Sequence, residues 1–166
     1  MSTARPRFNY ARVAPGVYDA MDALDNYLET TTLEPVLRQL VQVRASQING
    51  CAYCLDMHTK DVRALGETEQ RLYTLEAWRE CNYYTDRERA ALTWTEAVTR
   101  VWADRVPTAI YDEVRAHFTD KEMADLTLAV ATINAWNRLA ISARLAPGHY
   151  QPTPPVMPPT STTPAV

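Results

Sequence analysis

The residues best suited to chemistry lie within one short segment of the chain. Two cysteines, Cys51 and Cys54, are separated by two residues, and His58 follows four residues after the second. Residues three and four apart share one face of an α-helix, so a helix here would bring the three side chains together. Asn49-Gly50 would begin that helix and place Cys51 in its first turn, where free backbone N–H groups favour an anion. The spacing therefore predicts a site built from two thiols and an imidazole.

A cysteine pair beside an imidazole is suited to redox chemistry, because a thiolate rather than a thiol attacks peroxides and disulfides. With a pKa near 8.5, only about 3% of a cysteine is thiolate at pH 7, whereas a pKa of about 6 would make it roughly 90% thiolate. The helix dipole contributes about 0.3–1 kcal/mol, so an imidazolium or an imidazole hydrogen bond must supply the rest. The second cysteine can then close a disulfide on the sulfenic acid, which prevents further oxidation.

The choice of attacking cysteine depends on two opposing arguments. The dipole favours Cys51, which is nearer the start of the helix, whereas the four-residue spacing brings His58 within reach of Cys54. The dipole decays within one turn, and a histidine contact perturbs a thiol more strongly. We therefore expect Cys54 to react with the peroxide and Cys51 to act as the resolving thiol.

Zinc is the main alternative for the same three side chains. Two cysteines and one histidine would leave the metal one position for a fourth ligand or water. The remaining candidates, Cys81, His117 and His149, show no ligand spacing, and we expect Cys81 to be a packing residue. We therefore predict no bound metal. The sequence contains neither G-x-G-x-x-G nor a P-loop, so we also expect no nucleotide cofactor.

Helices must position the site, because apolar residues recur at three- and four-residue spacing along most of the chain. Ser or Thr followed by Glu after three residues predicts capping boxes at Thr31–Glu34, Thr85–Glu88 and Thr119–Glu122. Gly66 is expected to end the helix that contains the cysteines. Helices are predicted over residues 17–29, 35–49, 51–64, 69–79, 85–105, 109–117 and 119–145. The predicted fold class is all-α, a bundle of about six or seven helices.

The overall composition limits the possible partners. The chain has 166 residues, 46% hydrophobic and 22% charged, with a net charge of −3, which fits one domain with its own core. No basic block occurs, so we expect no nucleic-acid partner. Residues 1–10 lack the apolar segment of a signal peptide, and no apolar run approaches the roughly 20 residues of a membrane helix. We therefore expect a cytoplasmic protein with no membrane contact.

The C-terminal end differs in composition from the rest of the chain. Seven of the eleven prolines lie within residues 147–166, mixed with Ser and Thr. Such a segment favours extended or disordered conformations and has little apolar surface to bury. We divide the chain into an all-α domain, residues 1–146, and a proline-rich tail, residues 147–166, which we expect to lie along a neighbouring subunit.

Several segments of the sequence resemble the carboxymuconolactone decarboxylase superfamily, specifically its alkylhydroperoxidase D-like branch. The most specific is Ser-Gln-Ile-Asn-Gly-Cys-Ala-Tyr-Cys at residues 46–54, followed by Met57-His58. Further matches lie at residues 40–45, 76–80, 87–92 and 133–138, so the resemblance covers roughly residues 36–140.

This resemblance implies an all-α, AhpD-like fold that assembles into trimers or hexamers through helix packing. It implies an antioxidant peroxidase with peroxiredoxin activity, which reduces a hydroperoxide at the expense of a dithiol donor of the lipoyl or thioredoxin-like kind. In the family the second cysteine reacts with the peroxide, in agreement with the choice of Cys54 above. Cys51 is then the resolving thiol and His58 is the motif histidine.

One position departs from the family pattern, which has a glutamate twelve residues before the first cysteine. That residue here is Gln39, which can hydrogen-bond the imidazole or orient a water but cannot take a proton at neutral pH. We expect Gln39 and Asn49 to act as auxiliary polar groups. Glu96 and Glu80 are the candidates for a substitute carboxylate.

The leading prediction is a thiol-dependent hydroperoxide reductase, and two other functions stay open at this point. A lactone decarboxylase, the activity that names the superfamily, needs general acid and base groups rather than a thiol pair, so the intact pair argues against it. A non-enzymatic redox-sensing or assembly protein would keep the cysteines while losing turnover, and Gln39 is the residue that favours it.

Overall fold

The chain folds as an all-α structure, as its sequence predicts. The structure, a computed structural model, describes residues 5–152. Its elements are α1 (Tyr10–Val13), α2 (Pro15–Glu29), α3 (Pro35–Asn49), α4 (Ala52–Ala64), α5 (Glu69–Thr74), the 3₁₀ helix η1 (Leu75–Glu80), α6 (Asp86–Thr99), α7 (Val101–Asp104), α8 (Thr108–Arg115) and α9 (Asp120–Ala143). Within these residues the helices outnumber the six or seven expected, because α1 and α7 are single turns and one predicted helix is divided.

Helix ends follow the local sequence at three of the predicted caps. Thr85 and Glu88 form a reciprocal capping box at the start of α6, and Thr119 and Glu122 form another at the start of α9. Gly66 has a φ of 97°, a left-handed conformation that ends α4 without the steric cost a side chain would add. These caps fix where the helices that frame the core begin and end.

The third predicted capping box, Thr31–Glu34, is wrong. The Thr31 hydroxyl donates to the carbonyl of Leu28, so it closes the end of α2 rather than opening α3. Glu34 itself is the residue before α3 and makes no side-chain cap, while Pro35 occupies the first turn as expected. A threonine hydroxyl that bonds a carbonyl of the preceding turn is not available to cap the next helix.

Two predicted helices are shorter than the apolar pattern suggests. The expected helix over residues 69–79 becomes α5 and then η1, with a kink at Ala77 (φ −106°, ψ 27°). The kink belongs to a segment that buries both Leu75 and Trp78, so tertiary packing overrides helix propensity there. Helix α6 ends at Thr99, well before the expected break at Pro107, and the single-turn α7 follows.

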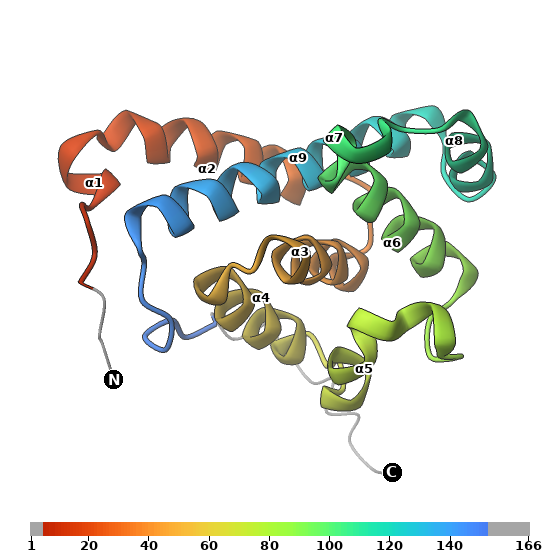
Figure 1. Cartoon of the computed structure of the whole chain (residues 1–166), viewed down its shortest axis with the longest axis horizontal. Coiled ribbons are helices and arrows are strands. Elements are labelled where there is room, and N and C mark those ends of the chain that lie inside the picture. The colour runs from red at the N-terminus through yellow and green to blue at the C-terminus, as the bar shows by residue number, and fades with distance from the viewer. Residues whose placement is uncertain (1–4, 153–166) are drawn as a thin grey trace, which may run out of the picture.

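Helix α3 is the centre of the molecule and packs against α4, α6 and α9 (Figure 1). One apolar cluster on it includes Val41 and Leu126, and a second includes Leu40 and Leu75, all of them buried. A third, smaller cluster surrounds the cysteine segment. Burial of a side chain of this size contributes about 1.5–3 kcal/mol, so the helix that leads into the cysteines is held on several sides.

A buried ion pair joins α3 to α6. Glu96 accepts hydrogen bonds from Arg44 (Nε–Oε1 2.8 Å), from the indole of Trp78 (2.9 Å) and from Arg79 (2.6 Å). Burial raises the pKa of Glu96, but the hydrogen bonds and the charge of Arg44 lower it by more. The pKa of Glu96 therefore lies below its ordinary value. The carboxylate is therefore fully engaged in holding the helices together.

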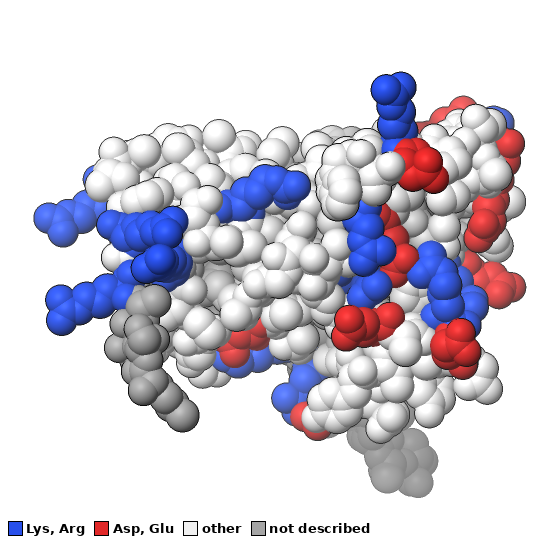
Figure 2. Space-filling view, viewed as in Figure 1, with Lys and Arg blue, Asp and Glu red and all other residues white. Residues whose placement is uncertain are grey.

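The surface mixes charges of both signs. Figure 2 shows basic and acidic side chains side by side over the end of the molecule that carries α6 and α8, with a largely uncharged area beside them. The Trp102 side chain is 81% exposed within this chain. In the part of the chain that the structure describes, no helix has both the length and the apolar character needed to cross a bilayer.

Replacing Glu96 with Gln should lower the free energy of unfolding by about 3 kcal/mol, because the substitution leaves the Arg44 guanidinium buried without its counter-charge. The matched control is Glu34→Gln, since Glu34 is about half exposed where it pairs with Arg87 (side-chain exposure 52%) and should change stability by less than about 1 kcal/mol. Urea unfolding of both variants measures the difference, and equal effects would contradict a structural role for the buried pair.

Candidate active site

The cysteine segment is set by a tight junction between α3 and α4. Gly50 ends α3 with a left-handed φ of 67°, and the chain turns directly into α4. Cys51 is the N-cap residue of α4 rather than a member of its first turn, which corrects the expected helix start by one residue. Cys54 is the third residue of the helix, and its backbone N–H donates to the Cys51 Sγ at 3.3 Å. The helix terminus therefore directs a hydrogen bond at one sulfur of the pair.

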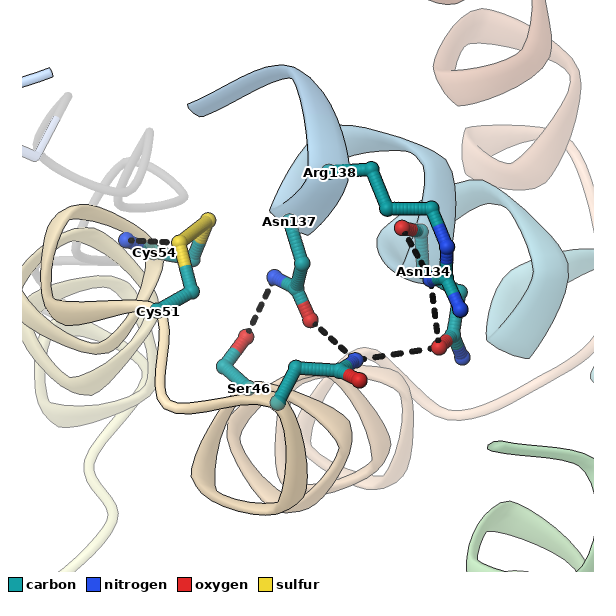
Figure 3. The surroundings of a disulfide bond; sticks show 7 residues. Ser46, Cys51, Cys54, Asn134, Asn137 and Arg138 are labelled. Atoms are coloured by element: carbon teal, nitrogen blue, oxygen red, sulfur yellow. Dashed lines mark hydrogen bonds between the residues drawn. A yellow bond between two sulfur atoms is a disulfide. The ribbon is translucent and has the colours of Figure 1, made fainter. Parts of the chain in front are cut away.

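A cluster of side-chain amides holds this junction against α9. The Asn49 Nδ2 donates to the Oδ1 atoms of Asn137 (2.7 Å) and Asn134 (3.0 Å), and the Asn137 Nδ2 donates to the Ser46 Oγ (3.0 Å). Figure 3 shows this network beside the cysteine pair. Asn49, predicted as an auxiliary site group, thus bonds α9, where it fixes the turn that positions the cysteines.

The two cysteines lie together as the spacing predicted and are joined as a disulfide. Their Cα atoms are 5.4 Å apart, within the range that a disulfide spans. Both residues are buried, with 1% and 2% exposure for Cys51 and Cys54. The pair can therefore alternate between a dithiol and a disulfide without a large movement of the backbone.

His58 lies one turn after Cys54 on α4 and is buried. Its Nδ1 is 3.0 Å from the Gln39 Oε1, and because an amide oxygen only accepts, the ring carries its proton on Nδ1. The opposite nitrogen, Nε2, is buried and has no hydrogen-bond partner within residues 5–152. Burial lowers the pKa of His58 to about 4, so at neutral pH the ring is uncharged and Nε2 is a free base.

A cavity of about 320 Å³ adjoins these residues. Cys54, His58 and Gln39 line it, whereas Cys51 does not. Most of its remaining wall is apolar or aromatic, and its aromatic members are Tyr10, Tyr18, Tyr53 and Trp136. A small molecule in this cavity would meet one sulfur of the pair and the imidazole, but not the second sulfur.

The wall of the cavity contains groups that sequence reasoning did not identify. Tyr18 and Trp136 come from α2 and α9, and their rings pack with centroids 5.4 Å apart. The Trp136 indole donates to Asp25 (2.7 Å), whose pKa is raised by burial. Trp136 lies in the family-like segment of residues 133–138, whereas Tyr18 and Asp25 belong to no motif. The three residues are far apart in the sequence, so no local signal marks them as neighbours of the cysteines.

A second missed residue is Asp61. Its Oδ2 lies 3.8 Å from the His58 Nδ1, on the same helix one turn later. Here a signal was present, because residues three apart on a helix share a face. Neither candidate for a substitute carboxylate lines the cavity: Glu96 is engaged in its buried ion pair, and Glu80 is exposed.

The other metal candidates do not gather at the cysteines. The Cys81 thiol contacts the backbone carbonyls of Thr74 and Ala77, and His117 and His149 are exposed. Among the described residues, no group of three or more His, Cys, Asp or Glu side chains is arranged to hold a metal ion.

Comparison with known proteins identifies relatives along most of the chain. The model of the carboxymuconolactone decarboxylase family matches residues 15–97. The uncharacterized protein YdfG of Bacillus subtilis is 42% identical over 136 residues, which are 82% of this chain and 92% of YdfG.

Solved structures agree with this assignment. ATU0492 of Agrobacterium tumefaciens, a protein of unknown function provisionally named as the antioxidant defence protein AhpD, superposes with a TM-score of 0.84 at 41% identity over 87% of this chain and 99% of its own. An uncharacterized peroxidase-related protein from Silicibacter sp. TM1040 gives a TM-score of 0.71 at 28% identity over 79% of this chain and 70% of its own.

The buried, neutral His58 should make stability depend on pH. Its pKa of about 4 lies below the ordinary 6.5, so the unfolded chain binds the extra proton first and stability falls as the pH drops from about 6.5 toward 4. Between pH 7 and pH 4 the wild type should lose about 3 kcal/mol more than the His58→Gln variant. Urea unfolding at both pH values measures this, and parallel pH profiles would show that the imidazole is not buried in its neutral form.

Proposed function

Because the chain belongs to the carboxymuconolactone decarboxylase family, in its alkylhydroperoxidase D-like branch, we propose that it is a thiol-dependent hydroperoxide reductase. The observation that carries this proposal is the asymmetry of the cysteine pair. Cys54 lines the cavity beside a neutral imidazole, and Cys51 lies behind it at the helix terminus. A peroxide that enters the cavity reaches the one sulfur with a base close at hand.

In the first step the reduced Cys54 transfers its proton to the Nε2 of His58 and attacks the terminal oxygen of the hydroperoxide. The O–O bond breaks, Cys54 becomes a sulfenic acid, and the departing alkoxide takes a proton and leaves as an alcohol. The sulfur gives up two electrons and the peroxide takes them. The geometry supports His58 as the base, because Gln39 fixes the ring proton on Nδ1 and leaves Nε2 free.

In the second step Cys51 gives up its proton and attacks the Cys54 sulfur, and the disulfide forms as the S–O bond breaks. The hydroxide that leaves takes up that proton and departs as water. The hydrogen bond from the Cys54 N–H to the Cys51 Sγ stabilises negative charge on the resolving sulfur. The same bond helps Cys51 to leave when a donor reduces the disulfide. We propose a dithiol donor of the lipoyl or thioredoxin-like kind, a cytoplasmic location where thiols are kept reduced, and a trimeric or hexameric assembly.

A redox sensor that forms the disulfide without efficient turnover is the second candidate. The observation that favours it is Gln39, which accepts a hydrogen bond from His58 but cannot carry a proton onward. Both functions share the first oxidation, so steady-state turnover with a dithiol distinguishes them. Many turnovers per disulfide indicate a reductase, and a single stoichiometric oxidation indicates a sensor.

Replacing Cys54 with Ser should abolish the consumption of cumene hydroperoxide, because no thiolate then faces the cavity. Replacing Cys51 with Ser should leave one oxidation of Cys54 per chain but prevent turnover, since the sulfenic acid finds no resolving thiol. The matched control is Cys81→Ser, which replaces the third cysteine. Cys81 does not line the cavity, so this variant should retain full turnover.

Mass analysis after one equivalent of hydroperoxide completes this test. The wild type and Cys81→Ser should each lose two hydrogens from the peptide that contains residues 51–54. When Cys51→Ser is introduced into either protein, Cys54 should instead carry a sulfenic acid. Oxidation that maps first to Cys51, or turnover that survives Cys54→Ser, would contradict the assignment.

A further inference from the structure

The proton that His58 takes from Cys54 leaves a charged ring in a buried place. The side chain of His58 is 7% exposed, and its Nδ1 bonds a neutral amide, Gln39, which can accept a hydrogen bond but cannot balance the charge. A buried imidazolium without a counter-charge is costly to form, which would slow the first oxidation. The first oxidation therefore requires a carboxylate close to the His58 ring.

Within residues 5–152, Asp61 supplies the carboxylate that lies within ion-pairing distance of the ring. Its Oδ2 is 3.8 Å from the His58 Nδ1, and its side chain is 20% exposed, so it reaches both the buried ring and solvent. The other charged groups along the wall of the first cavity are Arg38 and Glu29, which pair with each other at 2.8 Å, Asp25, which accepts a hydrogen bond from the Trp136 indole, and Asp22. Among the described residues, none of these four forms an ion pair with His58. Asp61 is thus the carboxylate left to respond to a charge on His58.

Asp61 is held in place by the segment that follows α9. The Tyr150 hydroxyl donates to the Asp61 Oδ1 at 2.5 Å, which leaves Oδ2 facing the imidazole. This segment is fixed on α4 by two more bonds, from Lys60 to the Tyr150 carbonyl (3.0 Å) and from the Gly148 N–H to Asp56 (2.9 Å). A residue close to the start of the proline-rich tail therefore sets the orientation of a carboxylate at the site.

A second cavity, of about 280 Å³, adjoins Asp61. Asp61, Tyr150 and Gln39 line this second cavity, and Gln39 also lines the first cavity, next to Cys54 and His58. The two cavities share Glu29, Arg38 and Gln39 in their walls, and Cys54 lines the first whereas Asp61 lines the second.

We propose that Asp61 is a positioning residue of the peroxidase reaction, whose carboxylate stabilises the imidazolium formed on His58, and that Tyr150 holds it in the productive orientation. The proposal rests on the function proposed above. Asp61 supplies from α4 the negative charge that the neutral Gln39 does not supply from α3. Gln39 and Asp61 both lie near the His58 Nδ1, so a carboxylate introduced at position 39 should replace the function of Asp61.

The test measures the rate constant for oxidation of Cys54 by cumene hydroperoxide in a single turnover of the reduced full-length chain, followed by rapid quench and mass analysis. Asp61→Asn should slow this step at least about tenfold, and Tyr150→Phe should slow it severalfold. The double variant Gln39→Glu with Asp61→Asn should recover most of the wild-type rate. A merely structural role for Asp61 would not be rescued by a charge at position 39.

A second hydrogen bond between a tyrosine hydroxyl and an aspartate supplies the controls. Tyr27 donates its hydroxyl to Asp125 at 2.9 Å, and neither residue lines the two cavities. Tyr27→Phe and Asp125→Asn should therefore leave the rate constant within about twofold of the wild type, even where they lower the melting temperature.

The outcomes separate this inference from the function on which it rests. If the wild type does not oxidise at Cys54, the proposed function fails. If the wild type does oxidise at Cys54, two results would show that Asp61 does not stabilise the His58 imidazolium. One is a wild-type rate for Asp61→Asn, and the other is a slow rate that Gln39→Glu does not restore. Should Asp61→Asn not fold, Tyr150→Phe decides: a slower rate at an unchanged melting temperature supports the proposal, and an unchanged rate overturns it.

Discussion

The turn between α3 and α4 is the constraint on which the site depends. Gly50 allows the left-handed turn, and Asn49 fixes it by bonding two amides of α9, so the start of α4 is defined to the residue. With that start, Cys51 caps the helix and Cys54 lies in its first turn facing the cavity. A shift of one residue would rotate α4 by about 100° and turn the reactive sulfur away from the cavity. The chemistry therefore depends on the packing of α9, which lies far from the cysteines in sequence.

Burial of His58 is the second feature that the account requires. An exposed imidazole would be partly charged at neutral pH and free to adopt either tautomer, whereas the buried ring is neutral and Gln39 assigns its proton to Nδ1. Desolvation outweighs the nearby Asp61 carboxylate in the resting state, so the ring starts uncharged. Formation of the imidazolium during reaction is the point at which that carboxylate matters.

Much of the fold and the centre of the site could be predicted from the sequence, because local signals determine them. Capping residues and apolar spacing locate most helices, and the spacing of Cys51, Cys54 and His58 places them on α4 and its N-cap. The wall formed by Tyr18 and Trp136 could not be predicted, since it arises where helices distant in sequence meet. Local rules failed where tertiary contacts competed, as in the kinked segment of residues 69–80, which buries Trp78.

The proposed chemistry depends on a neutral imidazole with a free Nε2 next to the reactive thiol. Long-range ¹H–¹⁵N NMR of reduced protein with ¹⁵N-labelled histidine observes both ring nitrogens of His58 directly. We expect a single neutral tautomer at pH 7, protonated on Nδ1 and unprotonated on Nε2, whose signals disappear in the His58→Gln variant. A charged ring at pH 7, or a proton on Nε2 in the neutral form, would contradict it.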